Sequence, residues 1–130
     1  MQVSTREPAD PVRVPADVLI VEDDPIIALD FEDTILSLGA RHVRCAGSVA
    51  TALDLIAARV PEFALLDVGL AREKSFAVAE KLAALKIPFA FVTGYDADKV
   101  PPEFVGRPRL PKPCSSDALL IVLRRFAPGS

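Results

Sequence analysis

Hydrophobic residues alternate along this chain between short continuous runs and longer stretches with helical spacing. The continuous or nearly continuous runs predict five β-strands, at residues 18–21, 42–46, 63–66, 89–92 and a short one at Leu110. Apolar positions recur at helical spacing over residues 26–38, 49–56, 76–85 and 119–126. Ser48 and Ser116 are candidate N-caps, and Gly39 is a suitable helix end. The chain is therefore predicted to alternate strands with amphipathic helices.

One segment interrupts this alternation. Between Thr93 and Pro108, two glycines and two further prolines break any helical register (Gly94, Pro101, Pro102 and Gly106). The fourth helix is therefore predicted to be short or irregular. We also expect this segment to exchange its amide protons fast from Tyr95 to Gly106 and to become ordered when a phosphoryl group binds nearby.

Strands that are apolar throughout, when they alternate with helices, indicate a parallel sheet covered on both faces. We therefore predict an α/β fold with a doubly wound, five-stranded parallel sheet, flavodoxin-like, with strand order 2-1-3-4-5. Residues 17–127 form the predicted domain. Residues 1–16, with Pro8, Pro11 and Pro15, are predicted to be a flexible N-terminal tail, and residues 128–130 a C-terminal tail.

The composition excludes several classes of protein. The chain has 130 residues, of which 51% are hydrophobic and 25% charged, with a net charge of −3. These values exclude a disordered polyelectrolyte and give no electrostatic support for binding nucleic acid or anionic lipid. No apolar run approaches the ~20 residues of a membrane span. We therefore expect a cytoplasmic protein that binds neither nucleic acid nor membrane.

Chemistry-bearing residues stand where the predicted strands end. Glu22, Asp23 and Asp24 follow the first strand, Asp67 the third, Thr93 the fourth and Lys112 the fifth. Because the carboxyl ends of parallel strands meet at one edge, these groups are expected to lie together. Carboxylates so close repel one another, and a hard cation with oxygen ligands relieves that repulsion. Mg²⁺ fits this set best, since it also accepts phosphate oxygens.

The same residues match the needs of phosphoryl transfer. Asp67 can act as a carboxylate nucleophile and form an aspartyl phosphate. Lys112 and Thr93 can stabilise the charge on the phosphoryl oxygens. Each residue alone has an ordinary explanation, as a helix cap or turn residue. Their coincidence at successive strand ends favours the functional interpretation.

Four motifs together resemble the receiver domain of two-component response regulators: Val18 to Asp24, Leu65-Leu66-Asp67, Thr93-Gly94 and Leu110 to Pro113. The resemblance implies a role for each of six positions: Asp67 as phosphoacceptor, Asp23 as direct Mg²⁺ ligand, Glu22 as a second acid acting mostly through water, Gly69 as a backbone carbonyl ligand, Thr93 as the switch hydroxyl and Lys112 as the lysine that pairs with the phosphoryl group. Asp24 is a third acid that could replace Glu22 in part. The resemblance also implies a cis Lys112–Pro113 bond.

Finer detail is similar to the FATGUY subgroup of receivers, on Phe91 to Tyr95 and on Glu73 to Phe76. Many members of that subgroup are single-domain proteins that work with histidine kinases of the HWE or HisKA2 type. The chain departs from ordinary receivers at Arg109, where an aromatic switch residue is usual. Tyr95 is the only tyrosine available as a substitute.

Two functions follow from this pattern. The favoured one is a stand-alone response regulator that accepts a phosphoryl group on Asp67 from a histidine kinase or phosphotransfer protein. It then signals through a changed protein-binding surface or acts as a phosphate sink, without being an enzyme for another substrate. The alternative is a Mg²⁺-dependent phosphohydrolase with an aspartyl nucleophile. That class usually carries its nucleophile on the first strand, with a second Asp two residues later, whereas here Gly69 has that place.

Overall fold

A five-stranded parallel sheet forms the centre of the fold. The computed structural model describes residues 13–70, 73–94 and 100–127. The strands are β2 (Asp17–Val21), β3 (His42–Ala46), β4 (Phe63–Asp67), β5 (Phe89–Thr93) and β6 (Arg109–Pro111). They lie in the order β3-β2-β4-β5-β6, which in chain order is 2-1-3-4-5. The predicted doubly wound sheet is confirmed.

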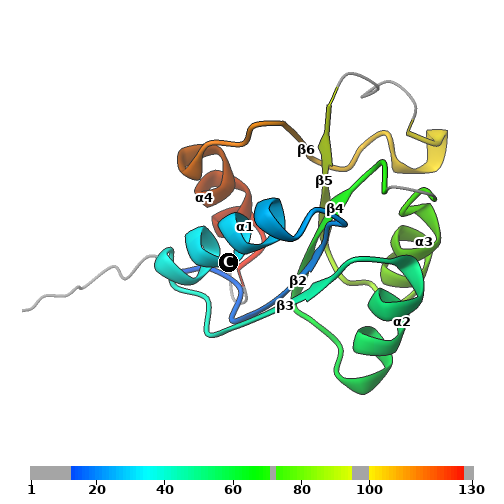
Figure 1. The fold of residues 1–130 in the computed structure, drawn as a ribbon, viewed down its shortest axis with the longest axis horizontal. Helices are drawn as coiled ribbons and strands as arrows, with labels where there is room; N and C mark the ends of the chain where they lie inside the picture. Colours follow the sequence, from blue (N-terminus) through cyan, green and yellow to red (C-terminus); the bar gives the residue numbers. More distant parts are fainter. Residues whose placement is uncertain (1–12, 71–72, 95–99, 128–130) are drawn as a thin grey trace, which may run out of the picture.

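Helices cover both faces of this sheet. The α-helices are α1 (Pro25–Ser37), α2 (Val49–Ala58), α3 (Phe76–Ala84) and α4 (Ser116–Arg125). Figure 1 shows α1 and α4 on one side of the sheet and α2 and α3 on the other. Among the described residues, no helix combines the length and the apolar character needed to cross a membrane.

The helix caps follow the sequence closely, with one correction. The Ser48 hydroxyl accepts a hydrogen bond from the Thr51 N–H at 3.2 Å, as expected of an N-cap. At α4 the predicted cap, Ser116, is wrong: Ser116 is the first helical residue, and Ser115 is the cap. Ser115 has an extended backbone, and its hydroxyl accepts from the Ala118 N–H at 3.1 Å. Two adjacent serines offer the same cap chemistry, so sequence could not separate them.

Apolar layers on both faces explain the continuous apolar runs of the central strands. Toward α2 and α3, the strands contribute Leu19, Leu66 and Phe91 to one buried cluster. Toward α1 and α4, the alternate residues Ile20 and Leu65 belong to a second cluster. Because successive strand side chains point to opposite faces, the central strands β2, β4 and β5 are buried along their whole length, whereas the edge strands β3 and β6 are partly exposed.

Residues 13–16, which precede β2, contact the rest of the domain. Val14 packs against the cluster beneath α1 and α4. Ala16 donates its N–H to Glu62 Oε1 at 2.6 Å, and its carbonyl accepts from the N–H groups of Arg41 and His42. Through these contacts, the residues just before β2 are held against the domain. The predicted domain and tail boundaries stay predictions, since residues 1–12 and 128–130 lie outside the described residues.

The segment before β6 contains the irregular helix that the sequence predicts. Between β5 and β6, the helix in the described residues is a single 3-10 turn at Pro102–Phe104. Phe104 anchors it, with 4% of its surface exposed and its ring 5.8 Å from that of Phe89. Tyr95 and the rest of residues 95–99 lie outside the described residues. The expectation of ordering on phosphorylation therefore stays a prediction.

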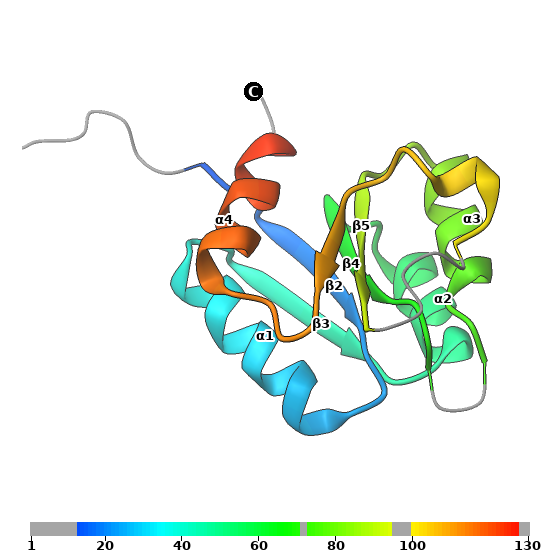
Figure 2. The ribbon, with the colours of Figure 1, turned by 90° about the horizontal axis from the view of Figure 1, so that it is seen from above.

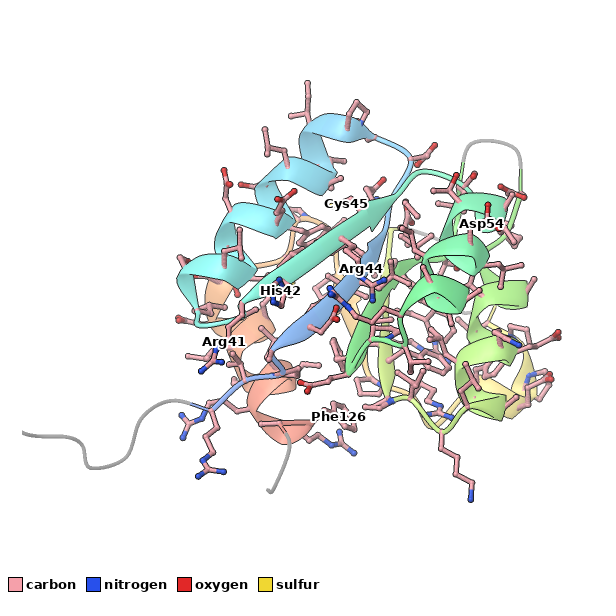
Figure 3. All side chains as sticks on the ribbon, turned by 90° about the horizontal axis from the view of Figure 1, so that it is seen from below. Arg41, His42, Arg44, Cys45, Asp54 and Phe126 are labelled. Atoms are coloured by element: carbon pink, nitrogen blue, oxygen red, sulfur yellow. The ribbon has the colours of Figure 1, made fainter. Side chains whose placement is uncertain are left out.

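A charge cluster closes the amino end of β2. Asp17 accepts from Arg44 Nη2 at 3.2 Å and lies 2.7 Å from Arg59 Nε. Arg44 extends from β3 toward the C-terminal end of α2, where it also donates to the carbonyls of Leu55 and Arg59 at 2.8 Å each (Figure 3). The carboxylate and both guanidinium groups therefore have direct partners.

Candidate functional site

Three carboxylates meet at the carboxyl edge of the sheet. Glu22 and Asp23 follow β2, and Asp67 ends β4. The two strands are parallel neighbours, with Val21 paired to Leu66, so their ends lie at one edge (Figure 2). One oxygen from each of the three side chains lies within 4.8 Å of the others. The predicted acidic cluster is therefore present in the fold.

Asp24 takes a different place from the other acids. Its side chain accepts hydrogen bonds from the N–H groups of Ile26 and Ile27, at 2.9 and 3.3 Å, and so caps α1. The acidic group given by the geometry contains Glu22, Asp23 and Asp67. Asp24 is thus the N-cap of α1, a role that its position before Pro25 favours.

Glu22 is the most deeply buried of the three acids, with 3% of its surface exposed. Burial raises the pKa of Glu22 to about 7, although hydrogen bonds from Lys112 and from the Asp24 N–H act in the opposite direction. The negative charge of Asp67 adds to the rise. Glu22 Oε1 lies 2.9 Å from Lys112 Nζ in an ion pair, and Glu22 Oε2 accepts the Asp24 N–H at 3.2 Å.

Lys112 joins two of the carboxylates. Its Nζ lies 2.9 Å from Glu22 Oε1 and 3.0 Å from Asp67 Oδ2. Burial alone would lower the pKa of Lys112, but the hydrogen bonds and charges of Glu22 and Asp67 outweigh burial and raise it. The Lys112–Pro113 peptide bond is cis, as expected. The ammonium is therefore charged and shared between two acids.

The charges of this edge suit a cation. Three carboxylates face one ammonium among the residues just described. Asp67 Oδ1 also accepts from the Gly69 N–H at 3.2 Å, which holds the carboxylate in place. Carboxylate oxygens are hard donors, and the one ammonium that contacts the buried Glu22 Oε1 is shared with Asp67. A hard divalent cation fits this donor set.

A cavity of about 250 Å³ opens over Asp67. Besides Asp67, it is lined by Gly69, Lys74, Thr93, Gly94 and Lys112. Thr93 ends β5 and is 5% exposed. A carboxylate, a hydroxyl and two lysine side chains thus line one small polar space, which can receive a tetrahedral anion next to the Asp67 carboxylate.

Most of the predicted site residues therefore come together, and their predicted roles remain hypotheses. Arg109 begins β6 with an exposed side chain, and Tyr95 lies outside the described residues. Sequence reasoning assigned no site role to Lys74, which lines the cavity. The available signal was weak: Lys74 follows the acceptor strand by seven residues and belongs to the motif from Glu73 to Phe76.

Comparison with known proteins rests on solved structures, because no protein-family model and no curated protein matches the chain. The solution structure of SdrG from Sphingomonas melonis Fr1 has a TM-score of 0.76 and 41% identity, over 86% of this chain and 96% of SdrG. The BeF3-activated conformation of SdrG from Pseudomonas melonis Fr1 has a TM-score of 0.75 and 39% identity, over 88% of this chain and 98% of the other.

A longer relative aligns over part of its length. The PhyR stress response regulator has a TM-score of 0.74 and 26% identity, over 91% of this chain and 48% of PhyR. The chain thus spans about half the length of PhyR. It matches SdrG over nearly the whole of that protein.

Proposed function

This chain belongs to the receiver-domain response regulators, and from that premise we propose that it accepts a phosphoryl group on Asp67 in a Mg²⁺-dependent reaction. The donor is a histidine kinase or a phosphotransfer protein. The phosphorylated chain then signals through a changed protein-binding surface or acts as a phosphate sink. The observation that carries the proposal is the ion pair of Lys112 with both Glu22 and Asp67, beside a cavity that Asp67, Lys112 and Thr93 line.

Asp67 supplies the nucleophile. One of its oxygens attacks phosphorus, and the phosphorus–nitrogen bond of the donor phosphohistidine breaks, with its electron pair leaving on the imidazole. The Gly69 N–H, which donates to Asp67 Oδ1 at 3.2 Å, limits rotation of the carboxylate. Fixing the attacking group in this way lowers the entropic cost of the transfer.

Asp23 and Asp67, with the backbone carbonyl of Gly69, would hold Mg²⁺, and Glu22 would assist through water. When bound, Mg²⁺ neutralises charge on the phosphoryl oxygens and orients them for in-line transfer. The fit rests on hard oxygen donors within 4.8 Å of one another and on a Lys112 ammonium that two of these three carboxylates must share. Asp23 is the least buried of the three acids, and so is accessible to a partly hydrated ion.

Lys112 and Thr93 stabilise the transferred group. The Lys112 ammonium lies 3.0 Å from Asp67 Oδ2, so it needs little movement to contact an oxygen of a phosphoryl group on that carboxylate. Its backbone N–H donates to the Thr93 carbonyl at 3.0 Å, which ties the end of β6 to the end of β5. The Thr93 hydroxyl donates to a second phosphoryl oxygen.

Finer assignments belong to the same proposal. We place the chain in the FATGUY subgroup, with a kinase of the HWE or HisKA2 type as donor and the cytoplasm as its location. The motifs Phe91 to Tyr95 and Glu73 to Phe76 support this placement. Labelling by candidate kinases, each compared with a kinase of another class, tests the donor.

The direct test is intact-mass spectrometry after incubation with acetyl phosphate and Mg²⁺. The wild-type chain should gain one phosphoryl mass, and peptide mapping should place it on Asp67. Asp67→Asn, which keeps the side-chain shape, should gain none. Asp54→Asn is the matched control, since Asp54 is an exposed acid on α2 (Figure 3), and this variant should be labelled like wild type.

Equal labelling of Asp67→Asn and wild type would contradict the assignment. A phosphohydrolase, the alternative function, would instead release phosphate continuously from small organic phosphates, and its aspartyl phosphate would be a short-lived intermediate. Counting phosphate released per chain separates the two. The BeF3-activated conformation known for SdrG suggests beryllofluoride as a second probe of the same carboxylate.

A further inference from the structure

We propose that Lys74 is a second phosphoryl-binding cation in the Asp67 cavity and that it speeds the capture of anionic phosphoryl donors. This inference rests on the proposed function, and it adds a residue that sequence reasoning left without a role. It concerns binding and electrostatic stabilisation, so the covalent step on Asp67 is unchanged.

The backbone places Lys74 beside the acceptor. Gly69 and Lys74 form an isolated antiparallel bridge, which returns the chain past the end of β4. From there the Lys74 side chain lines the same cavity as Asp67 and Lys112. Its Nζ lies 3.7 Å from the position that a Cβ on Gly69 would occupy. Since Gly69 has no side chain, the ammonium can lie close to the backbone two residues after the acceptor.

Lys74 and Lys112 differ in the acids that they contact within the described part of the chain. Among the described residues, Lys74 forms no ion pair, whereas Lys112 is shared between Glu22 and Asp67. The adjacent acid, Glu73, points elsewhere: its Oε2 accepts from the Val49 N–H at 3.0 Å, at the start of α2. The cavity thus contains one cation held by carboxylates and a second, exposed cation that is available to an incoming anion.

An arriving phosphoryl group brings a large charge to a site that is already acidic. A phosphorylated side chain carries about −1.5 to −2 charges, and the cluster of Glu22, Asp23 and Asp67 repels it. A lysine ammonium is a compact, mobile point charge that can follow such a group. Because Lys74 is exposed, its effect is modest and screened by salt, with a Debye length of ~10 Å at 0.1 M. Lys74 should therefore affect the second-order rate of donor capture more than the final extent of labelling.

The test measures the second-order rate constant for phosphorylation by acetyl phosphate, at saturating Mg²⁺ and donor concentrations far below saturation. Lys74→Ala should lower this constant by about 1.5- to fivefold at low salt, the factor that an exposed ion pair gives, and the difference should shrink as salt increases. Lys74→Arg should restore most of the rate, since it keeps the charge. Lys81→Ala is the matched control, because Lys81 is an exposed lysine on α3 outside the cavity.

The outcomes separate this inference from the proposed function. If wild type is labelled on Asp67 and Lys74→Ala matches both wild type and Lys81→Ala at every salt concentration, the role of Lys74 is wrong and the proposed function stands. If Lys74→Ala unfolds at the wild-type temperature but is phosphorylated more slowly, a merely structural role for Lys74 is excluded. If Lys74→Arg fails to restore the rate of phosphorylation, the positive charge is not what matters, and the proposed role of Lys74 is wrong. An unlabelled wild-type chain overturns the proposed function and this inference with it.

Discussion

A buried carboxylate lies at each end of β2, and the two carboxylates differ in how many cations balance their charge. At the amino end, Asp17 is 8% exposed and contacts two guanidinium groups, those of Arg44 and Arg59. At the carboxyl end, Glu22 is 3% exposed and shares one ammonium, that of Lys112, with a second acid. The strand is the same, but one end has an excess of cations and the other an excess of anions.

This difference separates a structural charge cluster from a site. Asp17 contacts both guanidinium groups and Arg44 also donates to two carbonyls, so the charges at this end are balanced without a further ligand, although the buried Arg44 Nε forms no hydrogen bond with the described residues. Glu22 Oε1 contacts the Lys112 ammonium at 2.9 Å, yet the pKa of Glu22 is raised to about 7, chiefly by burial, so the folded chain holds the charge of Glu22 at a cost. Functional sites are often places where such a cost is retained. A bound cation would reduce the cost of holding the charge of Glu22 at the carboxyl end. At the amino end, the two guanidinium groups already balance the charge of Asp17.

The largest expected difference between the two ends is in metal affinity. Asp23→Ala removes a proposed direct ligand, and we expect its Mg²⁺ affinity to fall by ~100-fold or more, since even outer ligands are worth ~10- to 100-fold. Phosphorylation by acetyl phosphate should become minimal at accessible Mg²⁺ concentrations. Asp17→Ala, which removes an acid from the other end, should titrate with Mg²⁺ like wild type. Equal titrations for Asp23→Ala and wild type would contradict the placement of the metal.

Much of this site could be predicted because it depends on strand ends. A run of apolar residues followed by Asp67, and another followed by Glu22, needs only the rule that parallel strands share their carboxyl edge. The roles of Arg44 and Lys74 could not be predicted in the same way. Arg44 depends on how α2 packs on β3, since it donates to the carbonyl of Leu55. Lys74 depends on the bridge that returns the chain to Gly69.

The next effect concerns the pH dependence of stability in the metal-free chain. The pKa of Glu22 is raised from 4.5 to about 7 in the folded state, mainly by burial. The unfolded state therefore loses this proton first, so wild type loses stability as the pH rises from about 4.5 to 7. The loss is at most about 3 kcal/mol, because one pKa unit corresponds to ~1.4 kcal/mol.

Glu22→Gln removes this dependence and provides the comparison. In EDTA, the variant should be more stable than wild type at pH 8, and the advantage should disappear toward pH 4.5, as read from urea midpoints at each pH. Adding Mg²⁺ should reduce the advantage at pH 8, since a cation favours the ionised carboxylate of wild type. Parallel pH profiles for the two proteins would show that Glu22 titrates at its ordinary pKa.

The smallest expected effect is a difference in the free energy of unfolding between Asp→Ala substitutions at opposite edges of the sheet. Asp17→Ala should lower the free energy of unfolding by about 1–2 kcal/mol, below the value for a fully buried ion pair, for two reasons. Arg59 is half exposed, and Arg44 keeps its hydrogen bonds to two carbonyls, so neither cation is left buried without a partner.

Asp67→Ala in EDTA should leave stability unchanged or raise it, because Lys112 keeps Glu22 as a partner while one repelling carboxylate is removed. Urea unfolding at pH 7.5 measures both variants. A larger loss for Asp67→Ala than for Asp17→Ala would mean that the acidic edge stabilises the metal-free fold, and that the contrast between the two ends of β2 is not one of function against structure.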